Sequence, residues 1–161
     1  MKKITYLIIS LIFLNFINAC VGYKPIYTTT NLQFEIADYS IKTNKKLGSQ
    51  IYSKLYNLSK SNKKNAETKS ITIIIDTTKN KTATAKDSAG KVLDYKVILS
   101  SNITIKDYLT DDDIIKKNFS YSSTYKVQEQ YSETLKLENK TIENLINKIY
   151  QNLLIELSQS I

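Results

Sequence analysis

The strongest constraint on the fold is a run of alternating side chains at residues 93–106. One set of positions is mainly apolar: Leu93, Tyr95, Val97, Leu99, Ser101, Ile103 and Ile105. The intervening positions are mainly polar, and successive side chains of a strand point to opposite faces of its sheet. The run therefore predicts one long strand with a packed face and a face that meets water or a polar partner.

Three further segments predict strands of the same sheet. Residues 32–37 alternate as a short half-buried strand, residues 71–85 form a second strand, and residues 119–127 alternate as the last strand. Asp87–Gly90 has the composition of a turn, and residues 107–113 have that of a loop. Together with the alternating run, these segments predict four strands.

Two segments carry apolar residues at helical spacing, which predicts one apolar face on each helix. The first stripe is Leu47, Ile51, Leu55 and Leu58. The second stripe is Ile142, Leu145, Ile149, Leu153 and Leu157, widened by Ile146 and Leu154. The first helix is expected to be capped by Thr43 or Asn44 and weakened at Gly48, and the second to begin between residues 132 and 139. The lysine-rich residues 59–70 predict a flexible connector.

The predicted order of elements is β-α-β-β-β-α, which favours an α+β two-layer sandwich. Two amphipathic helices can cover one face of a four-stranded sheet and so bury both apolar stripes. A chain of 161 residues is long enough for one domain and hardly for two. We therefore expect residues 32–161 to form a single domain of this class.

The first 19 residues have the pattern of a secretory signal peptide. Lys2 and Lys3 supply a positive start, and an apolar run follows from Ile4 to Ile17. This run is shorter than the roughly 20 residues needed to span a bilayer. The alternative interpretation is an N-terminal membrane anchor that is not removed.

The only cysteine lies where such a signal peptide would be cleaved. The sequence Ile17-Asn18-Ala19-Cys20 has the pattern of a lipobox, so Cys20 is predicted to carry a covalent diacylglycerol and an N-acyl lipid. Two or three acyl chains anchor a protein stably to a membrane. Residues 20–31 would then form a lipidated, extended lead, and Val21 after the cysteine favours the outer membrane. The alternative is a buried cysteine at the end of a hydrophobic helix.

Composition excludes several kinds of site. The chain has no His, and its 23 basic residues are all Lys. Histidine-based catalytic triads, Cys/His zinc sites and intramolecular disulfides are therefore impossible, and we expect no metal and no cofactor beyond the lipid. The formal charge of +8 suits a polyanion. A secretory signal and the lack of a dense basic patch argue against nucleic acid and favour lipid headgroups or lipopolysaccharide phosphates.

The polar face of the predicted sheet is a candidate partner surface. Its members are hydroxyl or amide side chains: Ser100, Asn102, Thr104, Ser120, Ser122 and Thr124. A sheet face that meets only water usually mixes Lys and Glu, whereas these groups can hydrogen-bond to a polar protein wall. The alternative interpretation is a solvated face in a chain rich in Ser and Asn.

Two segments resemble a known family. The start of the predicted mature chain resembles the Cys-Gly-Phe/Tyr-x-Pro-Leu-Tyr motif of the alphaproteobacterial branch of the lipopolysaccharide-assembly lipoproteins, the LptE family. The matching residues are Cys20, Gly22, Tyr23, Pro25, Ile26 and Tyr27, with Val21 as one extra residue. Residues 82–85 and 95–97 also resemble the central hairpin of that family, and the order of elements matches its fold over the mature chain.

The resemblance implies a non-enzymatic protein on the periplasmic face of the outer membrane. Members of the family sit inside the LptD β-barrel, assist its assembly and bind lipopolysaccharide. The polar sheet face would then contact the barrel. This chain departs from the family in offering only Lys where other members often offer Arg, and Lys lacks the bidentate geometry that Arg brings to phosphate.

Three lysines are the candidate lipopolysaccharide contacts. Lys86 and Lys91 bracket the predicted hairpin turn, and Lys136 lies just ahead of the second apolar stripe. Ammonium groups there could pair with lipid phosphates. The alternative is that all three are solvated surface lysines.

Two other features have competing interpretations. Asp111–Asp113 could ligate a hard cation, but their spacing does not fit a Ca²⁺-binding loop, and a solvated hairpin tip is the preferred interpretation. Tyr23, Tyr27, Tyr121 and Tyr125 could form an aromatic binding patch or could pack within the fold.

Two further function classes remain open from the sequence. One is another envelope lipoprotein that serves as an accessory subunit of a secretion, transport or cell-wall synthesis complex. The other is a lipoprotein enzyme that acts on cell-wall sugar. The spacing of the acidic residues does not place a carboxylate pair for glycoside hydrolysis, so we expect no enzymatic activity.

Overall fold

A computed structural model of the chain describes residues 32–61 and 68–161. The predicted signal peptide 1–19, the lipidation site Cys20 and the lead 20–31 lie outside the described residues. The elements follow the predicted order: β1 (Phe34–Ile41), α2 (Lys45–Ser61), β2 (Lys69–Lys86), β3 (Val92–Asp107), β4 (Asp113–Lys126) and α3 (Tyr131–Ser160). In the described part of the chain, no helix is long and apolar enough to cross a bilayer.

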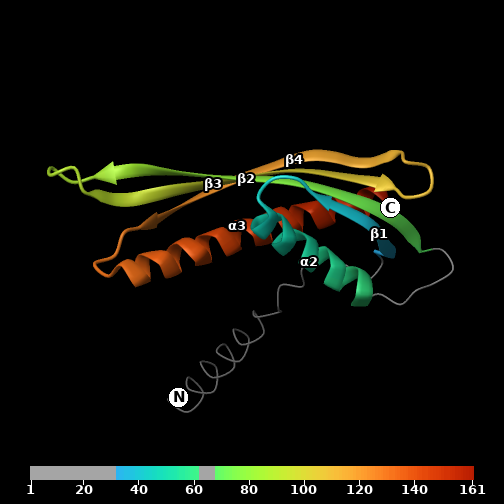
Figure 1. Cartoon of the computed structure of the whole chain (residues 1–161), viewed down its shortest axis with the longest axis horizontal. Helices are drawn as coiled ribbons and strands as arrows, with labels where there is room; N and C mark the ends of the chain where they lie inside the picture. Colours follow the sequence, from blue (N-terminus) through green and yellow to red (C-terminus); the bar gives the residue numbers. More distant parts are fainter. Residues whose placement is uncertain (1–31, 62–67) are drawn as a thin grey trace, which may run out of the picture.

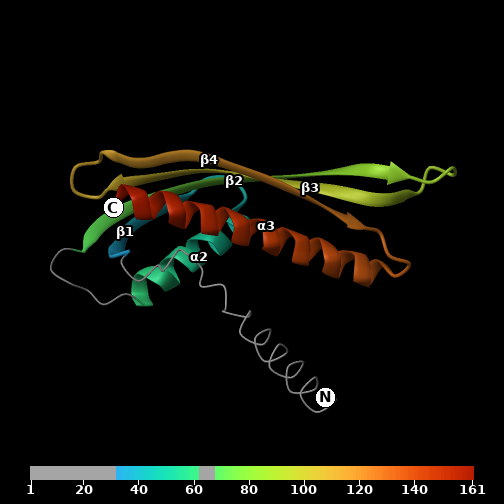
Figure 2. The ribbon, with the colours of Figure 1, turned by 180° about the vertical axis from the view of Figure 1, so that it is seen from behind.

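The four strands form one mixed sheet in the order β1-β2-β3-β4. β1 pairs in parallel with β2, and the other two pairs are antiparallel. Figures 1 and 2 view the molecule from opposite sides, and both place α2 and α3 on the same face of the sheet. The predicted two-layer α+β sandwich is therefore confirmed, and no helix among residues 32–61 and 68–161 covers the opposite face of the sheet.

The core lies between the sheet and the helices. The predicted inner face of β3 is buried from Val97 onward, with Val97, Leu99, Ile103 and Ile105 fully inaccessible, whereas Leu93 at its start is 44% exposed. Both helical stripes meet it, because Ile51, Leu55, Ile149, Leu153 and Leu157 are also fully buried. Ser101 interrupts this apolar set, and its hydroxyl pairs at 2.9 Å with that of buried Thr77. The pair satisfies two polar groups that would otherwise be costly to bury.

The cap of α2 follows the sequence prediction, and its glycine has a structural role. The side chain of Asn44 accepts a hydrogen bond from the backbone N–H of Leu47 at 3.2 Å. A Cβ atom at Gly48 would lie 2.5 Å from Cγ2 of Ile41. Because Ile is stiff at its branched Cβ, glycine at this position lets the helix pack closely against the end of β1.

Several predicted boundaries were too narrow, and both ends of the predicted connector 59–70 are regular structure: α2 runs to Ser61 and β2 begins at Lys69. α3 begins at Tyr131, just ahead of the predicted range 132–139. Its N-cap residue, Gln130, makes no side-chain capping hydrogen bond, so the sequence carries no capping signal at this boundary. β1 continues from the predicted 32–37 to Ile41, beyond a bulge between Ile36 and Asp38 that shifts the alternation. β4 begins at Asp113 rather than at 119, because polar side chains interrupt its apolar positions there.

Candidate partner-binding surfaces

The open face of the sheet brings all six predicted polar residues together. Ser100 lies opposite Ser120 in the β3–β4 ladder, and their hydroxyls are 2.8 Å apart. Asn118 donates a hydrogen bond to Asn102 across the same ladder at 2.6 Å. Of the predicted set, Ser100 and Thr104 are half-buried and the other four are exposed. The residues therefore form a connected polar surface rather than isolated side chains.

The second strand extends this surface, which the sequence analysis did not recognise. Thr78 of β2 lies opposite Ser100, and Asn80 lies opposite Ile98, which in turn faces Ser122. Two adjacent rows across three strands thus carry no charged side chain. We call the rows that contain Thr78 and Asn80 the polar rows. The polar rows can be recognised only from the register between strands, because the alternation within β2 does not indicate which residues of β3 lie opposite Thr78 and Asn80.

The β2–β3 hairpin places Lys86 and Lys91 on either side of a tight turn. The carboxylate of Asp87 accepts hydrogen bonds from the backbone N–H groups of Ala89 and Lys91, at 2.9 and 2.8 Å. Gly90 closes the turn with a φ of 83°, which suits a residue without a side chain. Both lysines are exposed, and no carboxylate of the described residues pairs with either.

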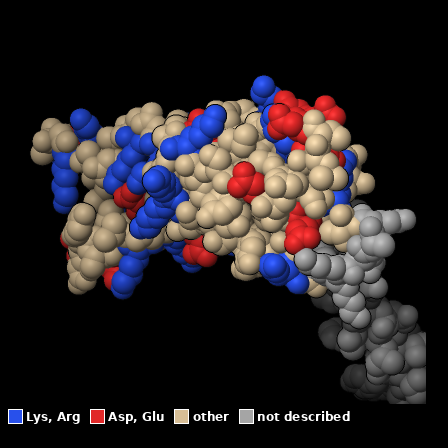
Figure 3. Space-filling model, turned by 45° about the vertical axis from the view of Figure 1, so that its right-hand side comes forward, with Lys and Arg blue, Asp and Glu red and all other residues tan. Residues whose placement is uncertain are grey.

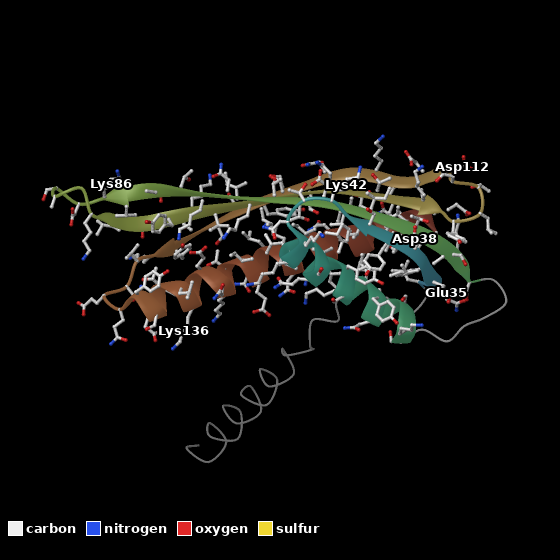
Figure 4. The ribbon with its side chains drawn as sticks, viewed as in Figure 1. Glu35, Asp38, Lys42, Lys86, Asp112 and Lys136 are labelled. Atoms are coloured by element: carbon white, nitrogen blue, oxygen red, sulfur yellow. The ribbon has the colours of Figure 1, made fainter. Side chains whose placement is uncertain are left out.

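Lys136 lies in the first part of α3, at the same end of the molecule as the hairpin tip (Figure 4). Its ammonium is 2.8 Å from Glu133, one helical turn earlier, and its side chain is 73% exposed. The structure therefore places all three candidate lysines at one end. Lys86 and Lys91 offer unpaired charge, whereas the charge of Lys136 is partly neutralised.

A cluster that the sequence analysis missed joins the hairpin to α3. Glu138 of α3 accepts from Lys79 at 3.1 Å, from Lys81 at 2.6 Å and from the hydroxyl of Tyr125 at 2.8 Å. The ammonium of Lys81 also lies 4.2 Å from the ring centroid of Tyr95, within range of a cation–π interaction. We call these five residues the brace. These residues come from β2, β3, β4 and α3 and are far apart in the sequence, so no sequence motif identifies them.

Two groups of the brace, Glu138 and Lys81, have pKa values shifted in the direction that favours their charged forms. Burial opposes the ionisation of Glu138, but the hydrogen bonds from Lys81, Tyr125 and Lys79 outweigh it and lower the pKa of Glu138 to about 2. Burial also opposes the charged form of Lys81, yet its bonds to Glu138 and Tyr125 raise the pKa of Lys81 above its ordinary value. Both groups therefore stay ionised at neutral pH, and the ion pairs between them persist there.

A groove of about 1130 Å³ lies beside the brace, between α2 and the first half of α3. Apolar side chains that include Leu47, Leu135 and Ile142 line it. Its charged lining residues are five lysines and two glutamates: Lys46, Lys54, Lys79, Lys136, Lys140, Glu138 and Glu143. The lining is therefore amphipathic with an excess of positive charge, a composition suited to an anionic amphiphile.

Charge is distributed unevenly over the molecule. In Figure 3, lysine side chains gather toward the hairpin half of the visible face, and acidic side chains cluster toward the opposite end. The acidic end contains the β3–β4 loop, where Lys106 lies 3.0 Å from Asp111 and 3.9 Å from Asp113. Lys106 therefore already partners the acidic loop residues that the sequence analysis had considered for a cation.

The predicted aromatic patch is not assembled among the described residues. Tyr125 is buried within the brace, and Tyr121 lies under the ammonium of Lys148, which is 4.7 Å from its ring centroid. Tyr23 and Tyr27 lie outside the described residues. The interpretation of Tyr121 and Tyr125 as packing residues is the one that the structure supports.

Comparison with known proteins places the fold among bacterial lipoproteins. No family model matches the sequence, and no curated protein matches it. A solved structure called uncharacterized lipoprotein B from Nitrosomonas europaea has a TM-score of 0.56 and 14% identity, covering 83% of this chain and 88% of that chain. A structure described as a putative lipoprotein from Caulobacter crescentus has a TM-score of 0.53 and 12% identity, covering 77% of this chain and 88% of that chain.

A minor lipoprotein from Acinetobacter baumannii gives a similar result. Its TM-score is 0.52 at 12% identity, covering 78% of this chain and 93% of that chain. Identities this low establish a shared fold and no more. The fold of this chain is therefore one found in bacterial lipoproteins, and it extends over most of the length of each.

Proposed function

We propose that the protein is a lipoprotein of the LptE type, anchored through Cys20 to the periplasmic face of the outer membrane. In this proposal it fills the lumen of an LptD-like β-barrel, assists the assembly of that barrel and binds lipopolysaccharide, without enzymatic activity. The observation that carries the proposal is the open face of the sheet, where the polar rows cross three strands. The fold shared with bacterial lipoproteins supports it.

The chemistry of the polar rows suits a polar wall. Hydroxyl and amide groups both donate and accept hydrogen bonds, so they can adapt to mixed donors and acceptors on a partner. The interior of a transmembrane barrel is polar and presents such groups. Two rows without a charged side chain also avoid burying an unpaired charge when the partner covers them.

The uneven charge suits a second ligand at the hairpin end. Lys86 and Lys91 are exposed beside a hydrogen-bonded turn, and the lysine-lined groove lies on the helical side of the molecule. Phosphates of lipopolysaccharide would accept hydrogen bonds from such ammonium groups. In this arrangement the sheet face binds the barrel while the hairpin lysines meet lipid phosphate.

The proposal is tested by copurification of the full-length, tagged lipoprotein in mild detergent. We expect a large outer-membrane β-barrel protein to copurify with the unmodified chain. Ser100→Trp places a bulky ring in the polar rows and should abolish that copurification, because it holds the partner away from the sheet.

The matched control is Ser53→Trp, at an exposed position on α2. This variant should retain the barrel. Retention of the barrel by Ser100→Trp would contradict the proposed contact. Recovery of a periplasmic or inner-membrane protein in place of a barrel would favour the accessory-subunit function instead.

A further inference from the structure

The two helices cover unequal lengths of the sheet. α3 has 30 residues and packs against β3 and β4, whereas α2 has 17 residues and packs against β1 and β2. In both Figure 1 and Figure 2, no helix of the described chain lies beside the first half of α3. The layer of helices is therefore two helices wide in one half of the molecule and one helix wide in the other. The groove between α2 and α3 lies where this change occurs.

The wall that α3 contributes to this groove has the spacing of a helix-packing surface. Leu135, Asn139, Ile142 and Ile146 line the groove at intervals of four, three and four residues. Rows with these intervals form the ridges against which a second helix packs. The row is about 17 Å long, because an α-helix rises about 1.5 Å per residue. Ile146 at one end is buried, whereas Leu135 at the other is 43% exposed, so the ridge is left uncovered toward the start of α3.

Positive charge flanks the ridge on both sides. Lys46 and Lys54 of α2 and Lys140 of α3 line the groove, and no carboxylate of the described residues lies within ion-pair distance of any of them. The two glutamates of the lining do not neutralise these lysines. Glu138 is held by the brace, which leaves Glu143 as the single uncommitted carboxylate. The groove therefore complements a partner that carries an excess of negative charge.

The composition of the chain and of the groove narrows the identity of that partner. Residues 1–31 and 62–67 contain five lysines and one glutamate, so these parts of the chain would add positive charge to the groove. An acyl chain needs apolar contact along its whole length, whereas amide and hydroxyl side chains line much of the groove: Asn44, Ser49, Gln50, Ser53 and Asn139. An amphipathic helix needs an apolar residue only every three or four positions, with polar residues on either side. The lining therefore favours a helix over a lipid.

We propose that the groove binds an acidic amphipathic helix of another protein, which completes the layer of helices over the sheet. The incoming helix lies along the ridge of α3 and continues the position that α2 occupies in the other half. Its apolar residues, at intervals of three and four, contact Leu135 and Ile142. Carboxylates on its flanks pair with Lys46, Lys54 and Lys140. The inference does not rest on the proposed barrel partner, because that contact uses the opposite face of the sheet.

The proposal is tested with a fluorescent peptide and the full-length chain in phosphatidylglycerol nanodiscs. The probe is a peptide of about 18 residues, long enough to form a helix, with Leu at intervals of three and four and with Glu and Ala elsewhere. The anionic discs repel an acidic peptide, and empty discs give the background. Fluorescence anisotropy should show saturable binding of this probe. A control peptide of the same composition, with its Leu residues no longer on one face, should bind roughly tenfold more weakly or less.

Two double variants locate the binding. Lys46→Glu with Lys140→Glu should weaken binding of the acidic probe by roughly tenfold or more, because like charges would then face each other across the groove. The matched control is Lys96→Glu with Lys116→Glu, which makes the same change of charge on the opposite face of the sheet and should bind as the unmodified chain does. Equal binding by the two double variants, equal binding of the two peptides, or no binding by the unmodified chain would overturn the proposal.

A second readout identifies the occupant in intact cells. A photoreactive benzoylphenylalanine in place of Leu135 should crosslink to a protein segment with net negative charge and apolar residues at intervals of three and four. The same residue in place of Leu109, which is 85% exposed at the far end of the molecule, should not crosslink to that segment. Mass spectrometry of the crosslinked peptide identifies the segment. A crosslink from position 135 to lipid alone, or to a basic segment, would overturn the proposal.

Discussion

The two halves of β2 show two ways of stabilising one strand. From Lys69 to Thr77, side chains alternate between the core and the open face, and Ile71, Ile73 and Ile75 are fully buried. From Thr78 to Lys86, nearly every side chain is exposed. We call residues 78–100 the arm: they comprise this second half of β2, the turn, and the start of β3 that pairs with it. In the first half burial holds the strand, whereas in the arm the strand depends on its ladder and on the brace.

The comparison shows that a strand can stay paired in the sheet well beyond the last of its residues that is buried in the core. The β2–β3 ladder continues through the arm with a bulge near Ala83 and Ala85, although no side chain of β2 from Thr78 to Lys86 is buried there. An isolated hairpin is at best marginally stable in water. The ladder of the arm is therefore sustained by β4, which pairs with residues 94–100 of β3, by the folded half from which the arm extends, and by the contact of Lys79 and Lys81 with α3.

The largest effect is expected from a charge in the covered half. Leu153 of α3 is fully buried against the sheet. Leu153→Asp should lower the free energy of unfolding by about 4 kcal/mol or more, since it removes apolar burial and buries an unpaired carboxylate. Urea denaturation followed by circular dichroism measures the change.

The matched change in the arm is Thr82→Asp, at an exposed position opposite Lys96. It should alter the free energy of unfolding by less than about 0.5 kcal/mol. Comparable losses in the free energy of unfolding in both variants would show that the arm contributes as much to stability as the buried half of the sheet.

The second largest effect concerns the brace. Glu138→Gln removes the carboxylate that joins two lysines and Tyr125, and should lower the free energy of unfolding at neutral pH by about 2 kcal/mol. The arm should also exchange its amide hydrogens faster, because its contact with α3 is weakened. Hydrogen exchange resolved by residue would detect this at residues 79–96 while the core strands stay protected.

The pH dependence gives the brace a separate signature. The pKa of Glu138 is lowered to about 2 in the folded chain, below its ordinary value of 4.5. Its contribution to stability is therefore complete above about pH 4.5 and is lost as the pH falls toward 2. The difference in stability between the unmodified chain and Glu138→Gln should shrink over that range. A difference that stays constant from pH 6 to pH 2 would contradict the role assigned to the carboxylate.

A smaller effect is expected where the two halves meet. Thr77→Val keeps the shape of the side chain but leaves the buried hydroxyl of Ser101 without its partner, at a cost of about 1 kcal/mol. Replacing both with Thr77→Val and Ser101→Ala should cost less than the sum of the single changes. Thermal unfolding of the four proteins in this double-mutant cycle gives the coupling energy, and strict additivity would show that the hydroxyl pair contributes nothing.

The smallest effect on stability, and a clear effect on binding, is expected at the tip of the arm. Lys86→Glu with Lys91→Glu should leave the thermal midpoint of unfolding almost unchanged, because both residues are exposed. Under the proposed function, the variant should bind lipopolysaccharide more weakly and with a shallower dependence on salt. Isothermal titration at two salt concentrations tests this, and unchanged binding would remove the hairpin lysines from lipid recognition.

The covered half was largely predictable from the sequence, and the arm's contacts were not. The period-2 pattern of 93–106 and the helical stripes follow directly from burial, so the strands, helices and inner faces could be derived from local alternation. The six polar residues of β3 and β4 were found because they share the same alternation. A strand or helix with one buried face has apolar residues at regular intervals, and these intervals can be recognised in the sequence.

The brace and the polar rows depend instead on register. Lys81 and Glu138 are 57 residues apart in the sequence, and each is an ordinary charged residue in its own segment. Nothing local distinguishes Glu138 from exposed acidic residues of the same helix. The polar residues Thr78 and Asn80 of β2 likewise became part of a surface only once the pairing with β3 was known.

The parallel pairing of β1 has a consequence for the order in which the chain can fold. The pairs β2–β3 and β3–β4 are each joined directly by a turn or loop, whereas α2 lies between β1 and β2, so that Phe34 pairs with Lys69. Non-local contacts form late because the intervening loop must first be closed. During synthesis, β1 therefore waits without a strand partner until β2 exists, whereas β2, β3 and β4 can assemble as consecutive hairpins. We therefore expect β1, which is synthesised first, to be fixed in the sheet only after the β2–β3 hairpin has formed, together with α2.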